Sequence, residues 1–197
     1  MKTMKTNDDL VPVSRFIAES ELNLDIATAI YEQYEQAREA IVKAFLAQLE
    51  ADLKSKLKGW SFSYDSPFFT SAYGLFSLHK PNWKGRYAIM LEAYDWGAGM
   101  IYGVWRNEES IGSVPRSAEL LGAVRKQLPD AVSRKYYEAE IEMTSPAKDW
   151  RKPNILWRMQ SDEKFCQEVK ALLLEVVELS ERRIDALVMN PPRAKEK

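Results

Sequence analysis

Apolar residues recur every three or four positions over a long stretch near the start of the chain. From about Glu21 to Lys58 the sequence contains neither glycine nor proline. The recurring apolar positions are Ile26, Ile30, Tyr34, Ala37, Ile41, Phe45, Leu49, Leu53 and Leu57. This spacing predicts one long amphipathic helix that ends at Gly59. Because successive steps of four exceed the period of about 3.6 residues, we expect a gentle bend or a break near residues 50–53.

A different pattern follows, in which aromatic and polar residues alternate. Thirteen of the 22 aromatic residues lie between Trp60 and Trp105. Alternation predicts strands over residues 60–64, 73–78, 87–94 and 100–106. Turn-forming residues separate them at 66–67, 80–85 and 96–99. Short strands joined by short turns predict an antiparallel meander.

The remaining pattern predicts a short helix from Ser117 to Gln127 and a second long helix. The long helix is expected to open at Ser161, to end before Asn190, and to carry an apolar stripe of Phe165, Val169, Leu172, Val176, Leu179, Ile184 and Leu187. Residues 131–160 leave helix and strand open: residues 131–143 contain helix formers, but Ile141 and Met143 suit a short strand. Residues 155–157 are predicted as a final strand.

Together these patterns predict an α+β fold, an antiparallel β-meander of four to five strands packed against long N- and C-terminal helices. Residues 1–20 are expected to form a loosely ordered lead-in, residues 21–189 a single domain, and residues 190–197 a basic tail. Either helix spans roughly 40–50 Å, against about 20 Å for a strand of six residues. The extra apolar length is expected to pack against the other helix or against a second chain, and the pattern leaves both open.

Composition narrows the class of protein. Apolar residues make up 46% and charged residues 29% of the chain, and the formal net charge is −1. These values are typical of a globular protein without a bulk attraction to nucleic acid or to acidic membranes. The single cysteine, Cys166, excludes an intrachain disulfide. With neither a signal peptide nor a membrane span in view, we expect a cytoplasmic protein.

The residue types that catalysis requires do not form a motif. One histidine, His79, and one cysteine are too few for the common zinc sites. Asp65, Glu92 and Asp95 suggest a magnesium-dependent nuclease, but Ala93-Tyr94 follows Glu92 where such enzymes need a lysine two positions on. The glycines after Trp96 precede no predicted helix, so they form no phosphate loop. We therefore predict no catalytic residue, metal or cofactor.

Aromatic residues near the predicted strand ends suggest binding instead. Trp83 and Trp96 fall in turns, and Trp105 is followed by Arg106. If adjoining strand ends bring them together, the predicted binding residues are Trp83, Tyr94, Trp96, Trp105 and Arg106. The alternative is that these side chains cover the open ends of the sheet.

Basic residues cluster loosely in the second half of the chain. They are Arg125, Lys126, Arg134, Lys135, Lys148, Arg151, Lys152 and Arg158. Such a cluster can contact nucleic acid, but acids intervene, and an ordinary solvated surface explains it equally.

One combination of segments resembles a known family. Gly59-Trp60-Ser61-Phe62, Gly74-Leu75-Phe76, Lys80-Pro81-Asn82-Trp83, the strand 87–92 and Tyr102-Gly103-Val104 lie between two long helices. This resembles the accessory region that follows the nuclease domain in some bacterial and phage proteins of the PD-(D/E)XK nuclease superfamily, over about residues 40–188. The resemblance implies an accessory module in a bacterial or phage setting, with a role in host–phage conflict.

The function predicted from these observations is a non-enzymatic protein-binding or regulatory module that also associates with itself. The alternative is a nucleic-acid-associated protein with degenerate or noncanonical metal-dependent nuclease function. It would bind through Arg125, Lys126, Arg134, Lys135, Arg151 and Lys152.

Overall fold

The computed structural model describes residues 12–69, 71–107, 116–144 and 147–189. These residues form an α+β fold with a five-stranded antiparallel sheet, which confirms the predicted fold class. The chain divides into two compact units, residues 1–38 and residues 39–197, where the sequence pattern indicated one domain over 21–189. The predictions for residues 1–11 and for the basic tail 190–197 lie outside the described residues.

The first unit is a helical hairpin. Helix α1 (Pro12–Ala18) occupies residues that were expected to form a loose lead-in, and α2 (Glu21–Lys56) begins three residues later. The turn between them is held by local hydrogen bonds. The hydroxyl of Ser20 accepts from the backbone N–H of Asn23 at 3.1 Å, and the Asn23 side-chain amide donates to the carbonyl of Phe16 at 2.7 Å. Ser20 thus caps α2 in the usual way for a residue before the first helical turn.

Helix α2 continues into the second unit and is unbroken through residues 50–53, where a gentle bend or a break was predicted. It ends where predicted, since Gly59 adopts a φ of 78°, a left-handed conformation that glycine tolerates best. The part of α2 within the second unit is amphipathic. It buries Val42, Phe45, Leu46, Leu49 and Leu53.

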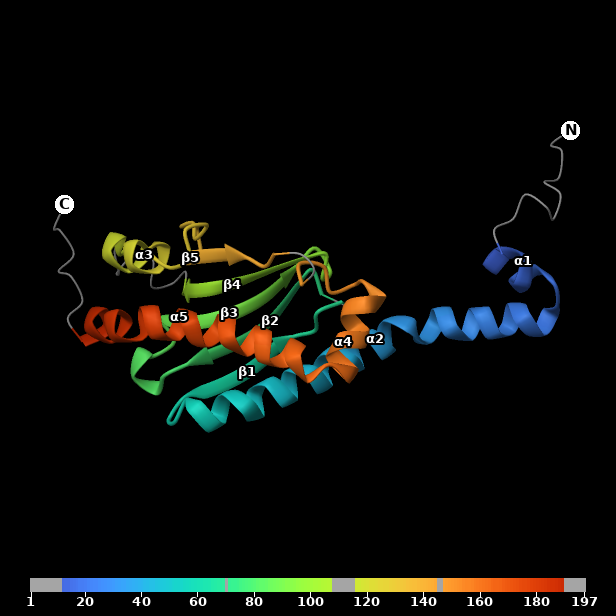
Figure 1. Ribbon diagram of the computed structural model, residues 1–197, viewed down its shortest axis with the longest axis horizontal. Helices are drawn as coiled ribbons and strands as arrows, with labels where there is room; N and C mark the ends of the chain where they lie inside the picture. Colours follow the sequence, from blue (N-terminus) through green and yellow to red (C-terminus); the bar gives the residue numbers. More distant parts are fainter. Residues whose placement is uncertain (1–11, 70, 108–115, 145–146, 190–197) are drawn as a thin grey trace, which may run out of the picture. The chain divides into compact units, whose positions relative to one another are not determined.

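The sheet is a simple meander in the order β1-β2-β3-β4-β5 (Figure 1). The strands are β1 (Ser61–Ser66), β2 (Tyr73–His79), β3 (Tyr87–Tyr94), β4 (Gly99–Arg106) and β5 (Tyr137–Glu142). A short 3-10 helix, η2 (Pro81–Trp83), makes the turn before β3. The first four strands lie where alternation predicted them. The fifth falls in the region that the sequence left open.

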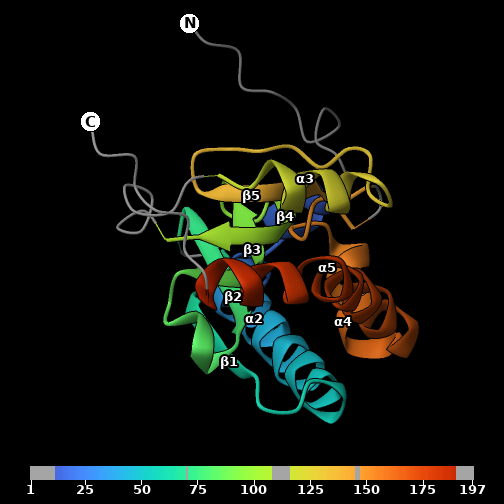
Figure 2. The ribbon, with the colours of Figure 1, turned by 90° about the vertical axis from the view of Figure 1, so that its left-hand side faces the viewer.

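The helices of the second unit pack on one face of this sheet (Figure 2). They are the second half of α2, α3 (Ala118–Arg125), α4 (Pro153–Ser161) and α5 (Glu163–Met189). Alternate residues of β3, namely Ile89, Leu91 and Ala93, belong to this helix-covered core. Ala88 and Met90 belong to a second, smaller apolar cluster. Since side chains alternate along a strand, this cluster lies on the other face.

One predicted element near the end of the chain is wrong, and the predicted start of another is shifted by two residues. Residues 155–157 form part of α4 rather than a strand. Pro153 stands in the first turn of α4, where its fixed φ suits a helix and its missing N–H costs nothing. The last long helix begins at Glu163 rather than at Ser161, which is the final residue of α4. Asp162 accepts a hydrogen bond from the backbone N–H of Lys164 at 3.0 Å and so marks the new helix start.

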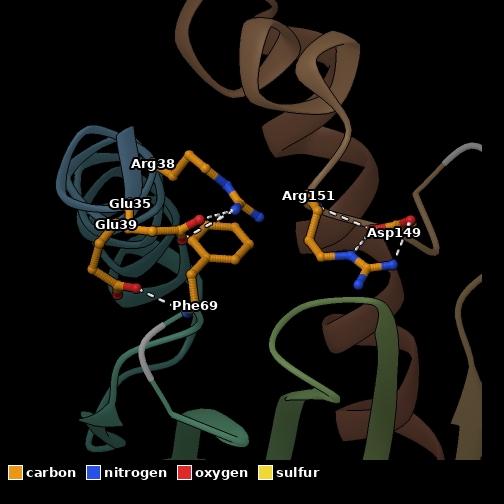
Figure 3. Close-up of polar contacts among 6 residues, drawn as sticks. All are labelled: Glu35, Arg38, Glu39, Phe69, Asp149 and Arg151. Atoms are coloured by element: carbon orange, nitrogen blue, oxygen red, sulfur yellow. Dashed lines mark hydrogen bonds and ion pairs between the residues drawn. The ribbon is translucent and has the colours of Figure 1, made fainter. Parts of the chain in front are cut away.

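Glu39 ties the beginning of the second unit to the connection between β1 and β2. Its carboxylate accepts hydrogen bonds from the backbone N–H of Phe68 at 3.0–3.1 Å. It also accepts one from the backbone N–H of Phe69 at 3.0 Å (Figure 3). The hydroxyl of Tyr64 donates to the same carboxylate. Three donors on one acceptor fix this helical turn against the sheet, because charged acceptors make the stronger hydrogen bonds.

Candidate protein-binding surface

Two of the predicted binding residues are interior. The Trp83 side chain is fully buried and packs edge-on against Trp60, with ring centroids 5.0 Å apart. Its indole N–H donates to the carboxylate of Asp185 on α5 at 2.7 Å. Burial raises the pKa of Asp185, but hydrogen bonds from Lys80, Trp83 and Asn82 outweigh it and hold that pKa below its ordinary value. Trp83 therefore joins η2 to α5 and offers no binding surface.

Arg106 is also interior, in a polar cluster at one end of the sheet. It is 5% exposed, and its guanidinium lies 3.4 Å from a carboxylate oxygen of Glu138, which is 1% exposed. Tyr87 stands opposite Arg106 in the sheet. Burial, together with the negative charge of Glu138, raises the pKa of the Tyr87 hydroxyl to about 12. Removing one partner of a buried ion pair leaves an uncompensated charge, so this cluster stabilises the fold only as a whole.

The register of β3 and β4 separates the predicted binding residues that remain. Tyr94 pairs with Gly99 at the turn, whereas Trp105 and Arg106 pair with Ala88 and Tyr87 at the opposite end. Seven residues at about 3.3 Å each put roughly 23 Å between the two ends. Tyr94 and Trp105 both pack, half-buried, against the second apolar cluster. The structure thus does not gather the predicted residues into one surface.

Trp96 is the predicted aromatic residue that is exposed, at 53%. It lies at the tip of the β3–β4 hairpin, where Asp95 and Trp96 both have φ near 50° (52° and 51°). A hydrogen bond fixes this tip to a distant segment, because the backbone N–H of Trp150 donates to the carbonyl of Gly97 at 3.1 Å. A single exposed aromatic ring is common on protein surfaces and defines no site by itself.

The second face of the sheet contains a half-buried carboxylate, that of Glu92. Ala88, Met90, Ile101 and Tyr137 form its apolar cluster, and the hydroxyl of Tyr137 donates to Glu92. Burial raises the pKa of Glu92, and the hydrogen bond from Tyr137 opposes that rise. Within the described residues, no group of three or more His, Cys, Asp or Glu side chains is placed to hold a metal ion.

Four of the eight clustered basic residues are paired with acids, namely Arg134, Lys148, Arg151 and Arg158. Arg134 lies 3.5 Å from Glu140, and Lys148 lies 3.0 Å from Glu142. Arg151 lies 3.1 Å from Asp149 (Figure 3). Of the others proposed for nucleic-acid contact, Arg125 donates to the carbonyl of Ala131, Lys135 donates to the hydroxyl of Tyr136, and Lys126 and Lys152 are exposed. Paired cations of this kind present little net positive field to a phosphate backbone.

A hollow of about 450 Å³ lies beside the last strand and contains some of these pairs. Asp130, Glu140, Arg134 and Lys148 contribute charges of both signs to its lining, and Val132 and Met143 contribute apolar surface. Ligand sites are mostly apolar with a few convergent polar groups, so this lining does not resemble one.

The first unit has the most distinctive surface. Every residue from 31 to 37 is exposed, and the first half of α2 exposes six large apolar side chains by 42–83%. They are Leu22, Leu24, Ile26, Ile30, Tyr31 and Tyr34. On α1, Val13 and Phe16 are exposed by 68% and 53%. Contiguous exposed apolar surface of this kind marks an interaction site in most soluble proteins.

The apolar and acidic residues of this half-helix occupy different sides. Counting about 100° per residue, the six apolar side chains cover an arc of roughly 200°. Glu21, Asp25, Glu32 and Glu35 fall on the remaining side. We call the six apolar residues the apolar arc. The arc is too wide for a two-helix seam and matches a helix that contacts more than one neighbour.

The charge of this unit is negative. Residues 12–38 contain five acidic and two basic residues, a formal net charge of −3. Arg38 is one of the two bases, and its guanidinium already pairs with Glu35 at 2.8 Å (Figure 3). The arc therefore lies on a unit that repels phosphate and anionic headgroups.

Ile26, Ile30 and Tyr34 were predicted to share one apolar stripe with Phe45, Leu49 and Leu53, and in the structure these three residues are exposed. Leu22, Leu24 and Tyr31 were not singled out. The signal in the sequence was the surplus length of the helix relative to the sheet, which left packing against the other helix or against a second chain open.

Comparison with protein-family models, with curated proteins and with solved structures gives no match. Among the described residues, no helix is both long and apolar enough to cross a membrane. The feature that bears most directly on function is therefore the apolar surface of the first unit.

Proposed function

We propose that this chain is a non-enzymatic protein-binding module whose partner docks on the apolar arc of α2. One observation carries the proposal, namely six large apolar side chains exposed by 42–83% on the first half of a helix. Water-exposed apolar surface of this extent is unfavourable, and burial against another protein removes it from water. A bacterial or phage setting, with a role in host–phage conflict, belongs to the same proposal through the resemblance of residues 40–188.

The free energy gained by burying the arc is comparable to the cost of association. Complete burial of a large apolar side chain stabilises by roughly 1.5–3 kcal/mol, so burying the exposed half contributes about 1 kcal/mol per residue. Six such residues contribute on the order of 6 kcal/mol, comparable to the lower range of the cost of association, about 4–15 kcal/mol. Burial of Val13 and Phe16 of α1 increases this favourable free energy further. Burial of the arc together with α1 thus offsets an association cost in the lower part of that range.

The charge pattern favours protein over nucleic acid. The unit with the apolar surface has a net charge of −3. In the second unit, Arg134, Lys148 and Arg151 are paired with acids. A nucleic-acid interface needs unneutralised cations on one face, and its affinity falls steeply with salt.

Affinity capture tests the proposal. The tagged chain is produced in bacterial cells together with an untagged copy of itself, and captured material is treated with nuclease and read by mass spectrometry. We expect a discrete protein that survives the nuclease and is lost from an Ile26→Glu/Ile30→Glu variant. The matched control, Asp25→Asn/Glu32→Gln, alters the acidic side of the same helix and should retain it.

Two other results would contradict the proposal. Capture that is unchanged in the Ile26→Glu/Ile30→Glu variant would place the binding surface elsewhere, and a Trp96→Ala variant then tests the hairpin tip. Recovery of nucleic acid, with every protein lost after digestion, would favour the nucleic-acid alternative.

A further inference from the structure

The large apolar residues of the arc include a continuous ridge. Leu22, Ile26, Ile30 and Tyr34 are spaced four residues apart, and each is exposed by at least 42%. Rows of side chains with this spacing form the helix ridges that pack into the matching grooves of another helix. When both helices use such ridges, their axes cross at about −50° and lie about 8–10 Å apart. A ridge of this type is complementary to a second copy of itself.

We propose that the occupant of the apolar arc is a second copy of this chain, so that two helical hairpins form a four-helix contact. The inference rests on the proposed function, because it names the partner of the same surface. In a two-fold arrangement the same patch serves both chains, with Ile26 of one copy facing the region of Ile30 in the other. The flanking residues Leu24 and Tyr31 then face the second helix of the other hairpin, α1.

The exposed area matches this occupant. Eight large apolar side chains are exposed on the hairpin, six from the arc and Val13 and Phe16 from α1. At roughly 100 Å² each, they offer about 800 Å² per chain, the amount that each partner buries in a stable interface of standard size. A single partner helix covers less than the roughly 200° of the arc, whereas a second hairpin supplies two helices with apolar surface of their own.

The charges allow two copies to approach. Glu21, Asp25, Glu32 and Glu35 lie on the side of α2 away from the arc, so they stay in solvent when two arcs meet. The two hairpins still repel each other at long range, since each has a net charge of −3. At physiological ionic strength, salt largely screens the repulsion between exposed charges that are more than about 8 Å apart. Added salt should therefore strengthen self-association, whereas it would weaken binding to a basic partner.

Sedimentation equilibrium of the full chain at low and high salt tests the inference. We expect the mass to rise from one chain to two with concentration, and the dissociation constant to fall at higher salt. The Ile26→Glu/Ile30→Glu variant should remain a monomer at every concentration, and the milder Ile30→Ala should weaken the dimer at least tenfold. The Asp25→Asn/Glu32→Gln control should dimerise as tightly as the wild type or more tightly. A urea unfolding curve confirms that each variant folds.

Three outcomes overturn the inference, and the capture experiment separates the first two. If the wild-type chain is a monomer throughout but captures a different protein through Ile26 and Ile30, the second copy is the wrong occupant and the proposed function stands. If it is a monomer and captures no protein, both fail. A dimer that persists unchanged in the Ile26→Glu/Ile30→Glu variant would place the contact between copies outside the arc.

Discussion

The two halves of α2 contrast in their environment although they share one helix and one spacing. In the second half, Phe45, Leu49 and Leu53 are 0–3% exposed. In the first half, Ile30 and Tyr34 are 61% and 42% exposed. Apolar residues at steps of three and four therefore specify a helix, but they do not specify what covers it.

The difference comes from residues far away in the sequence. Phe45 packs against Trp150 and Phe165, with ring centroids 5.6 Å and 5.4 Å apart. Asp52 accepts hydrogen bonds from Gln167 and Lys170 of α5 at 2.9 Å and 3.4 Å. Such partners exist for the second half within its own unit. The apolar arc of the first half is exposed, and we propose that another molecule covers it.

The largest expected effect comes from truncating the buried half. Phe45→Ala removes a fully packed ring and leaves a cavity among Trp150 and Phe165, so we expect the free energy of unfolding to fall by about 3–5 kcal/mol. Urea unfolding followed by tryptophan fluorescence measures it. A loss below about 1 kcal/mol would mean that this half of α2 is less tightly packed than its burial indicates.

A smaller effect is expected where the second unit begins. Glu39→Ala leaves the N–H groups of Phe68 and Phe69 and the Tyr64 hydroxyl without their shared acceptor. Unsatisfied buried donors cost about 1–3 kcal/mol, so urea unfolding should show a loss in this range. Glu39→Gln keeps one acceptor oxygen and should lose less. Equal losses in the two variants would argue against the hydrogen bonds as the cause.

A still smaller effect on the free energy of unfolding is expected from Asp52, and it depends on pH. Burial raises the pKa of Asp52, but hydrogen bonds from Lys170, Gln167 and Gln48 outweigh it and hold that pKa below its ordinary value of 3.8. A depressed pKa means that the unfolded chain binds more protons, so this contribution is present above about pH 4 and is lost as pH falls through the folded pKa. Asp52→Asn should therefore destabilise at pH 7, and this loss should shrink as the pH falls below about 4. A difference in unfolding free energy that is constant with pH would contradict this role.

The smallest expected effect on the stability of the monomer comes from the exposed half. Ile30→Ala removes a side chain that is 61% exposed, so urea unfolding at dilute, monomeric concentrations should change by less than about 0.5 kcal/mol. The same substitution should weaken the dimer. A large loss of monomer stability would show that Ile30 is covered within its own chain, and the contrast between the two halves would fail.

Local patterns predicted most of the fold. The strand from Tyr87 to Tyr94 was predicted at its observed limits, because turn-forming residues at 80–85 and 96–99 bound it on both sides. Residues 155–157 were predicted as a strand, because a run of three apolar residues does not distinguish strand from helix, and Pro153 determines the outcome. β5 was left open because its formation depends on pairing with β4, a contact between distant residues.

The candidate site was less predictable. Trp83 and Arg106 stand beside turns and strand ends, so the sequence suggested that they are exposed. In the structure both are buried, because Trp83 donates a hydrogen bond to Asp185 and Arg106 pairs with Glu138. Neither partner can be located from local spacing. The arc could not be distinguished from the core by spacing, because Ile26, Ile30 and Tyr34 belong to the same stripe as buried residues of the second half. Steps of four advance about 40° beyond each full turn, so the stripe winds around the helix.

Hydrogen–deuterium exchange at two protein concentrations tests whether a second copy covers the apolar arc, because it reports on both halves of α2 in one sample. We expect the amides of residues 42–53 to be protected at both concentrations. Amides of residues 22–36 should be protected at high concentration and exchange rapidly after dilution below the dissociation constant. Protection of residues 22–36 that does not change with concentration, or rapid exchange at every concentration, would contradict the claim that a second copy covers the apolar arc.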